Sequence, residues 1–399
     1  MAIDKIRYPE FLERVAREID IPPHKYRDAV RRYQAVGRWL EDGEYSGCSG
    51  EVVIYPQGSF RLGTVVRPVR LGVAAGYDID LVCELPSTKG VTTPQLIKHS
   101  VGDRLKQHDT YSRLLDDEGR RCWTLEYAEE DDIGFHLDVL PAIPDSGLTD
   151  TAIAITHKHD WGYDWSASDP RGYAAWFDGK NQAAFVRHAP EQKLAIQRLE
   201  SHIYARIDDV PDQLVRTPLQ RAIQLMKRNR DLHFNRPETV AYAPISIIIT
   251  TLAAHLYGGE GHAHSALVAI VEALQRHAAL VDNRAIDPGL AGLGLIRRLP
   301  DGSWYIANPV NSDENFADRW HEDGHARARA FFSWLEALQT DLLNPPTHLD
   351  PRRFKEHLAR ALGGAAVAPH ADMLVRPAPE VTPRRRVHIS NPAKPWRSG

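Results

Sequence analysis

The spacing of apolar residues predicts a strand-containing first part of the chain. Between Pro22 and Glu41, apolar residues recur at steps of three and four, which predicts one face of a long amphipathic helix. Four short runs rich in β-branched and aromatic residues then predict strands at 51–55 (EVVIY), 78–85 (DIDLVCEL), 121–127 (RCWTLEY) and 134–140 (GFHLDVL). The second run is apolar on both faces after its first residues, which is typical of a strand at the centre of a sheet.

The second part of the chain has a different pattern. Residues 155–177 are aromatic and rich in turn-forming residues, and we expect an irregular segment there. From Asn181 onward, helical periodicity dominates at 191–207, 217–234, 244–257, 264–280 and 326–343. The order of elements is therefore a helix, a mixed sheet and a helical bundle, which makes this an α+β protein.

The last 24 residues of the chain, 376–399, contain five prolines and six arginines or lysines against one glutamate. Such a segment cannot bury a core, so we expect a flexible basic tail. We place the boundaries at 1–160 for the sheet with its N-terminal helix, 161–375 for the helical lobe and 376–399 for the tail.

The composition narrows the class of protein. A chain of 399 residues with 43% hydrophobic and 26% charged residues can build a large core, and its net charge of −4 does not suggest general nucleic-acid binding. Cys48, Cys83 and Cys122 are widely spaced and odd in number, which argues against a disulfide framework. The N-terminus lacks the apolar core of a signal peptide, and the longest apolar stretch, 243–259, is too short and too rich in Thr and Ser to span a bilayer. We expect a monomeric cytoplasmic protein without membrane contact.

Three aspartates stand in the predicted strands. Asp78 and Asp80 are two residues apart, so their side chains point to the same face of a strand. Asp138 is a third carboxylate within an apolar strand. Like charges in a buried sheet are costly unless a cation neutralises them, and an all-oxygen donor set suits Mg²⁺. The pattern predicts a two-ion Mg²⁺ site, in which the ions would activate a hydroxyl and stabilise a leaving pyrophosphate.

Gly58-Ser59 follows the first predicted strand. A glycine there would let the backbone approach a phosphate, and the Ser59 N–H and hydroxyl could bond to its oxygens. Taken singly, these features have ordinary explanations, since Gly-Ser is common in surface turns and an Asp-x-Asp pair occurs by chance. Their order along the chain, with apolar flanks, is more specific than any of them alone.

The motifs QGSFRLGT (57–64), YDIDLV (77–82) and FHLDVLPA (135–142) resemble the nucleotidyltransferase core of the DNA polymerase β superfamily. More narrowly, they are similar to the bacterial cGAS/DncV-like nucleotidyltransferases (CD-NTases) of CBASS antiphage systems. DPRGYAAWF (169–177) and LQRAIQLMKRNRD (219–231) resemble further segments of this family, and NPVNSDENFADRW (308–320) is similar to a motif of oligoadenylate-synthetase-like enzymes. The resemblance covers about residues 5 to 370.

This resemblance implies a fold and a set of roles. The fold would be a polymerase-β-like core, made of a mixed sheet with a long spine helix, completed by the helical lobe. Asp78 and Asp80 would bind two Mg²⁺ ions, for which Mn²⁺ can substitute, and Asp138 would be the third ligand and help to activate the acceptor hydroxyl. Gly58 and Ser59 would hold the donor triphosphate together with Lys227, whose neighbours Arg228 and Arg230 are expected to point elsewhere. Ser246 would either contact a phosphate or cap its helix.

The implied activity is the synthesis of a cyclic di- or trinucleotide from purine NTPs (ATP or GTP), as a messenger that activates an effector during phage infection. The spacing between Ser59 and Asp78 is longer than in the family pattern, so residues 65–76 (VVRPVRLGVAAG) are expected to form an inserted loop. The terminal Gly399, at the end of the flexible tail, resembles the substrate of the E1/E2-like ligases that some CBASS operons encode.

Two other functions remain open from the sequence. One is a different nucleotidyltransferase, such as a poly(A)- or CCA-adding enzyme or a nucleotidylating antitoxin, although the acidic net charge weighs against a tRNA substrate. The other is a nucleotide sensor without catalysis, against which the three carboxylates argue.

Several histidines and aromatic residues could also bind ligands. His157, His159 and Asp160 could bind zinc, but histidines this close together are more often surface residues. The aromatic residues of the same region could stack on a base. We expect packing between the lobes for three of them and leave the other three undecided. The packing residues are Tyr173, Trp176 and Phe177, and the undecided ones are Trp161, Tyr163 and Trp165.

Overall fold

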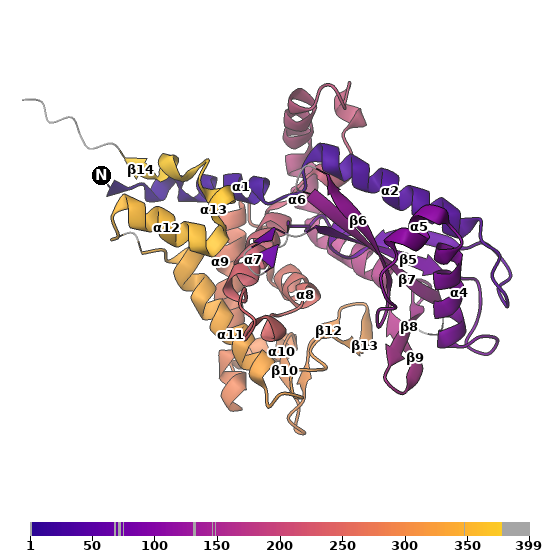
Figure 1. Ribbon diagram of the computed structural model, residues 1–399. Coiled ribbons are helices and arrows are strands. Elements are labelled where there is room, and N and C mark those ends of the chain that lie inside the picture. Colours follow the sequence, from indigo (N-terminus) through magenta and orange to yellow (C-terminus); the bar gives the residue numbers. More distant parts are fainter. Residues whose placement is uncertain are drawn as a thin grey trace, which may run out of the picture.

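The computed structural model describes residues 2–67, 69–70, 73–74, 76–130, 133–145, 147, 149–346 and 348–376. The part of the tail from residue 377 to Gly399 lies outside the described residues. The described chain forms a sheet-containing lobe and a helical lobe, side by side in Figure 1. This is the expected α+β architecture.

A mixed sheet forms the centre of the first lobe. Its strands are β2 (Val53–Gln57), β5 (Tyr77–Glu84), β6 (Trp123–Glu130), β7 (Ile133–Pro144), β8 (Ile153–His159) and β9 (Gly162–Ser168). The strand order is β2-β5-β7-β8-β9. Strand β6 also pairs with β7, along its first part, whereas β8 pairs with the end of β7. Strands β5 and β7 run parallel, whereas the other pairs in this sheet are antiparallel. All four predicted strands are therefore confirmed, and β8 and β9 were not expected.

Helices cover one face of this sheet. They are α2 (Pro23–Glu41), α4 (Pro94–Lys106) and α5 (Asp109–Leu114) (Figure 1). Leu81 and Cys83 of β5 pack there against Val36 and Leu40 of α2, so the predicted spine helix is confirmed. Strand side chains alternate between faces, so Asp78, Asp80 and Val82 point to the opposite face. All three cysteines are free thiols.

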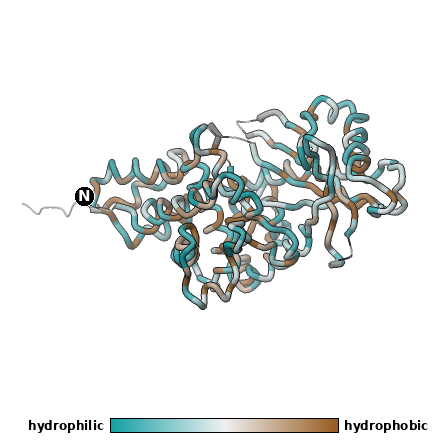
Figure 2. The backbone as a smooth tube through the Cα atoms, turned by 90° about the horizontal axis from the view of Figure 1, so that it is seen from below, coloured by the Kyte–Doolittle hydropathy of each residue, from teal (hydrophilic) through white to brown (hydrophobic). Residues whose placement is uncertain are grey.

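The helical lobe is built around α7, which is buried along most of its length. Its helices are α1 (Tyr8–Glu18), α6 (Pro170–Leu199), α7 (Pro218–His233), α8 (Ser246–Leu256), α9 (Ala263–Gln275), α10 (Pro288–Leu293), α11 (Ala326–Leu338), α12 (Pro351–Leu362) and α13 (Gly364–Val367). Apolar and polar residues alternate along these helices in Figure 2, as expected where one side of each helix faces a core. No helix in the described part of the chain is both long and apolar enough to cross a membrane.

Short strand pairs and one short helix complete the fold. The pairs are β1 (Ala2–Ile3) with β14 (Val375–Arg376), β3 (Val69–Arg70) with β4 (Val73–Ala74), β10 (Arg297–Arg298) with β11 (Trp304–Tyr305), and β12 (Ala307–Asn308) with β13 (Asn311–Asn315). The short helix α3 (Gly58–Arg61) follows β2. The expected insertion between Ser59 and Asp78 thus contains the β3–β4 pair.

Two sequence predictions were wrong. Residues 155–177 are regular: they form most of the β8–β9 hairpin and then the first turns of α6, which Asp169 caps by accepting a hydrogen bond of 2.8 Å from the Gly172 backbone N–H. The helix expected at 191–207 is also different: residues 191–199 are the last part of the long α6, which ends at Leu199.

The first helix, α1, does not belong to the sheet-containing lobe, although the expected boundary at residue 160 placed it there. Phe11, Leu12 and Val15 of α1 lie in the core of the helical lobe, with residues of α7, α9 and α11. The chain therefore starts in the helical lobe and crosses to the sheet between α1 and α2.

Candidate active site

Three carboxylates meet on the face of the sheet that α2 and α4 leave uncovered. In the parallel β5–β7 pair, Asp80 lies in register with Asp138, and Asp78 lies in register with His136. Asp78 and Asp80 share one face of β5, so the two strands bring together the three aspartates predicted from the sequence. Thr124 of the adjacent β6 donates a hydrogen bond of 2.5 Å to Asp138 Oδ1. His136 Nδ1 lies 3.3 Å from Asp78 Oδ1.

The electrostatics of this cluster favour a cation. Burial, together with the carboxylates of Asp138 and Asp78, raises the pKa of Asp80 to about 7, although Lys227 lowers it. Ionisation of Asp80 beside the other two carboxylates is therefore unfavourable in the folded protein, and a bound divalent cation would compensate the added negative charge. Among the described residues, no group of three His, Cys, Asp or Glu side chains is already arranged to hold a metal ion. The fit to Mg²⁺ thus rests on the oxygen donors and on the raised pKa of Asp80.

Gly58 lies directly against these carboxylates. The antiparallel β2–β5 pair puts Gln57 opposite Asp80, so the next residue starts α3 beside the cluster. Gly58 has a φ of +62°, and a Cβ added to it would lie only 2.2 Å from Asp80 Oδ2. A glycine is therefore required here for its backbone conformation and for the close approach. Ser59 follows Gly58 in α3.

Lys227 of α7 lies within electrostatic reach of the same cluster. Its ammonium Nζ donates a hydrogen bond of 2.9 Å to the carbonyl oxygen of Thr64, just after α3. Burial and Arg230 lower its pKa to about 8, and Asp78 and Asp80 are among the groups that raise it. An ammonium group has three N–H donors, so its contact with Thr64 still allows contact with a phosphate.

Arg230 and Ser246 form a second link beside Lys227. Arg230 Nη1 donates a hydrogen bond of 3.0 Å to Ser246 Oγ, at the first residue of α8. The N-cap of α8 is Ile245, so the capping alternative for Ser246 is wrong. Arg230, which we expected to point elsewhere, is near enough to lower the pKa of Lys227, although its guanidinium also bonds to Asp231 and to the Pro244 carbonyl oxygen.

We predict that Lys227→Met weakens NTP binding by about tenfold or more, because a lysine–phosphate contact strengthens in a partly desolvated cleft. Titration with a non-hydrolysable NTP measures this. Arg228→Met is the matched control, since Arg228 is a buried cation at the next position of α7. Equal losses in both variants would indicate a general effect of buried charge and would contradict a special role for Lys227.

The other candidate residues have structural roles. Tyr173 and Phe177 are buried in the helical-lobe core and Trp176 packs against it. This confirms a packing role, but within the helical lobe and not between the lobes as expected. The asparagines of the 308–320 motif hold the β12–β13 turn: Asn308 Oδ1 accepts from the Val310 N–H at 3.0 Å, and Asn311 Oδ1 accepts from the Asp313 N–H at 3.1 Å.

The histidines of the β8–β9 hairpin stack on aromatic neighbours. The rings of His157 and His159 are 4.1 Å apart, and Trp161, which is 72% exposed, stacks on His159 at 4.7 Å.

Sequence reasoning missed the polar residues that hold the site together. Thr124 and His136 contact the carboxylates, and Gln220 and Gln224 bond to the segment after α3. One signal was available: Gln220, Gln224 and Lys227 recur at helical spacing, which places them on one face of the predicted helix.

Comparisons with known proteins agree with this geometry. The family model "Cyclic GMP-AMP synthase DncV-like, nucleotidyltransferase domain" matches residues 52–141, which run from β2 into β7 and include Gly58, Ser59 and the three aspartates. A c-di-GMP synthase of Roseivirga ehrenbergii is 29% identical over 340 residues, which cover 84% of this chain and 79% of that protein. The cyclic dinucleotide synthase CdnG of Bradyrhizobium diazoefficiens is 28% identical over 330 residues, 78% of this chain and 70% of that protein.

The solved structure of the Bradyrhizobium diazoefficiens CD-NTase CdnG in complex with GTP has the same fold. It superposes with a TM-score of 0.67 and 22% sequence identity, and the match covers 92% of this chain and 98% of that chain. The domain match, the two relatives and this common fold show that the chain is a nucleotidyltransferase, similar in sequence and fold to the cGAS/DncV-like enzymes, the CD-NTases.

Proposed function

We propose that this enzyme is a Mg²⁺-dependent synthase that joins two nucleoside triphosphates, at least one of them GTP, into a cyclic dinucleotide. The observation that carries the proposal is the register of Asp80 with Asp138 across β5 and β7, with Asp78 on the same face and Gly58 against Asp80. The names of the relatives, a c-di-GMP synthase and a cyclic dinucleotide synthase, support the product class. The CdnG structure with GTP supports the choice of a purine substrate.

The residues of the site divide the work as follows. Asp78, Asp80 and Asp138 would hold Mg²⁺, which when bound lowers the pKa of the acceptor hydroxyl and neutralises charge on the leaving pyrophosphate. Thr124 fixes Asp138, which would help to activate the acceptor hydroxyl. Ser59 would bind the donor triphosphate beside the carboxylates, and Lys227 would neutralise its charge from the helical lobe. The donor triphosphate would thereby be held for in-line attack, and such positioning accounts for much of the rate in phosphoryl-type transfer.

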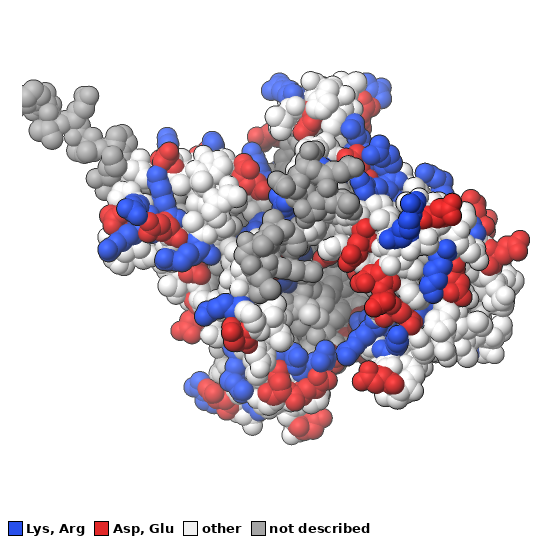
Figure 3. Space-filling model, viewed as in Figure 1, with Lys and Arg blue, Asp and Glu red and all other residues white. Residues whose placement is uncertain are grey.

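The two rival functions predict different products. In Figure 3, the coloured Lys and Arg residues on this face are interspersed with Asp and Glu and form no broad basic stripe, which weighs against a polynucleotide acceptor. Incubation with labelled NTPs and Mg²⁺, followed by phosphatase, separates the possibilities. A phosphatase-resistant product supports the synthase. A phosphatase-sensitive linear product indicates another nucleotidyltransferase, and unchanged NTP indicates a sensor.

We place this activity in the cytoplasm, where the product would act as an antiphage messenger on an effector that binds only the cyclic nucleotide.

The composition of the tail supports a second proposal: an E1/E2-like ligase would couple the carboxylate of Gly399 to a target, because glycine does not obstruct a narrow active-site channel. Deleting Ser398-Gly399 is then expected to abolish conjugation in cells while NTP turnover stays unchanged. Absence of any C-terminal adduct of the wild-type protein, with the ligase present, would contradict this.

A further inference from the structure

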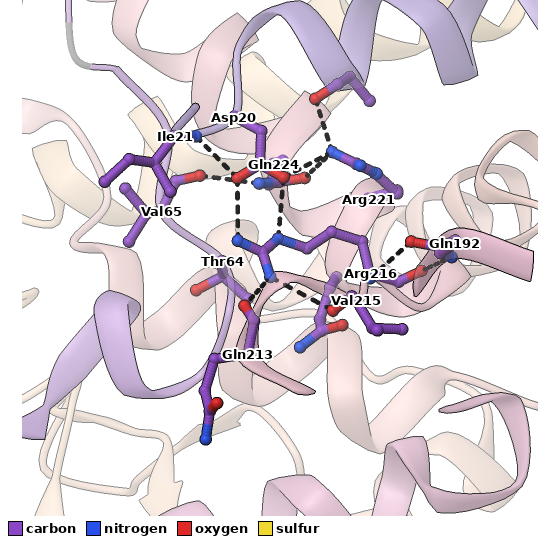
Figure 4. Close-up of polar contacts among 12 residues, drawn as sticks. Asp20, Ile21, Thr64, Val65, Gln192, Gln213, Val215, Arg216, Arg221 and Gln224 are labelled. Carbon is purple, nitrogen blue, oxygen red and sulfur yellow. Dashed lines mark hydrogen bonds and ion pairs between the residues drawn. The ribbon is translucent and has the colours of Figure 1, made fainter. Parts of the chain in front are cut away.

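A buried ionic cluster lies where the chain crosses from the helical lobe to the sheet. Asp20 stands between α1 and α2, and its carboxylate contacts Arg216, just before α7, and Arg221, in the first turn of α7 (Figure 4). Arg216 Nη2 donates to Asp20 Oδ1 at 3.0 Å, and its Nε lies 2.9 Å from Oδ2. Arg221 Nη1 donates to Asp20 Oδ2 at 3.0 Å. Only 11% of the Asp20 side chain is exposed, against 2% and 9% for the two arginines.

Gln224 connects this cluster to the segment that follows Gly58-Ser59. Its Oε1 accepts a hydrogen bond of 3.0 Å from Arg221, and its Nε2 donates one of 2.8 Å to the carbonyl oxygen of Val65 (Figure 4). Gln220 and Lys227, which share this face of α7, donate to the neighbouring carbonyl oxygens of Leu62 and Thr64. Three side chains of one helix therefore hold the backbone of residues 62–65.

Two hydrogen bonds to backbone carbonyl oxygens of residues 19 and 20 extend the cluster to the sheet. The Tyr77 hydroxyl donates a hydrogen bond of 3.2 Å to the Asp20 carbonyl oxygen, and Tyr77 is followed directly by Asp78 in β5. The Arg67 N–H donates one of 3.2 Å to the Ile19 carbonyl oxygen. The link between the lobes thus contacts the start of the carboxylate-bearing strand and the end of the segment after α3.

Stability alone does not explain this arrangement. Burying one carboxylate with two guanidinium groups has a large desolvation cost, and apolar side chains of similar volume often serve as well or better. Burial and Arg216 lower the pKa of Arg221 to about 10, although Asp20 raises it, so the charged form is not fully compensated. Ionic clusters of this kind are best attested where they fix a particular geometry.

We propose that Asp20, Arg216, Arg221 and Gln224 form a latch that sets the position of Gly58-Ser59 and of Lys227 relative to the carboxylates of β5. The residues of this latch touch no substrate and act through the groups that do, so they are positioning residues. The inference rests on the proposed function, because it assumes that Ser59 and Lys227 hold the donor triphosphate.

Two substitutions test the latch. Asp20→Asn keeps the shape of the side chain and removes its charge, whereas Gln224→Leu keeps the ion pairs and removes the link to Val65. We expect each to raise the KM for the NTP, and the Kd for a non-hydrolysable GTP analogue, by about tenfold, since small displacements of positioned groups have large effects. Partial unfolding would instead lower the apparent kcat and leave the KM unchanged. Gln224→Leu decides the matter alone if Asp20→Asn does not fold.

Arg206→Gln is the matched control, because Arg206 pairs with Asp209 on the surface with 77% of its side chain exposed. Its KM and Kd should equal those of the wild type. Wild-type KM and Kd in Gln224→Leu would overturn the latch and leave the proposed function intact. Failure of the wild type itself to bind the GTP analogue in the presence of Mg²⁺ would overturn both.

Discussion

Replacing Asp78 and Asp80 together by asparagine is expected to lower kcat by a factor on the order of 10³ or more, while the protein still folds. The loss follows because these carboxylates are the ligands proposed to hold Mg²⁺, and removing a preorganised charge-stabilising group costs this much in other enzymes. Steady-state assays of NTP consumption, with circular dichroism to verify the fold, measure it. Near wild-type turnover in the double variant would show that the metal assignment is wrong.

The same variant should be more stable than the wild type without metal. The folded-state pKa of Asp80, about 7, lies above its ordinary value of 3.8, so the native state binds more protons than the unfolded state between these values. The contribution of Asp80 to the free energy of unfolding is therefore fully present below about pH 4 and is lost as the pH rises through about 7. Thermal melts in EDTA should show this decline in the wild type and a weaker one in the variant, with a difference on the order of 4 kcal/mol at neutral pH. A pH dependence identical in both proteins would contradict the raised pKa.

Gly58→Ala is expected to lower activity by a factor on the order of 10², with a loss of stability of only about 1–2 kcal/mol. The added Cβ would lie 2.2 Å from Asp80 Oδ2, so the Asp80 carboxylate would have to move away from its present position. The backbone of Asp80 would stay in register with Asp138. NTP turnover and thermal unfolding of the variant measure the two effects.

Gly324→Ala is the control for backbone strain. Gly324 has the same φ of +62°, but a Cβ there would meet nothing within 4 Å. This variant should lose a similar amount of stability and no activity. An equally active Gly58→Ala variant would show that the close approach to Asp80 is not needed.

The parts of the site that the sequence predicted depend on local patterns. The apolar flanks of Asp78, Asp80 and Asp138 indicated buried strands, and a spacing of two placed the first two aspartates on one face. The long helix before them was also visible, because an amphipathic period of 3.6 over nineteen residues is a strong signal. These elements needed no knowledge of distant contacts.

The parts that the sequence did not predict depend on contacts between distant segments. Asp20 and Arg216 are 196 positions apart, and nothing near either residue indicates that they meet. Thr124 could be assigned to Asp138 only once the β6–β7 register was known. The β8–β9 hairpin was missed for another reason, since its alternating residues include histidines, threonine and lysine, which do not read as one buried and one exposed face.

The measurement that tests the central claim most directly is mass spectrometry of the phosphatase-treated products of the wild-type enzyme, supplied with GTP alone and with GTP plus ATP in Mg²⁺, beside the Asp78/Asp80 double variant. The account predicts a product of two nucleotides without a free triphosphate or terminal phosphate, made by the wild type, absent without a divalent cation and absent from the variant. A product that persists in the double variant, or one that is only linear and sensitive to phosphatase, would contradict it.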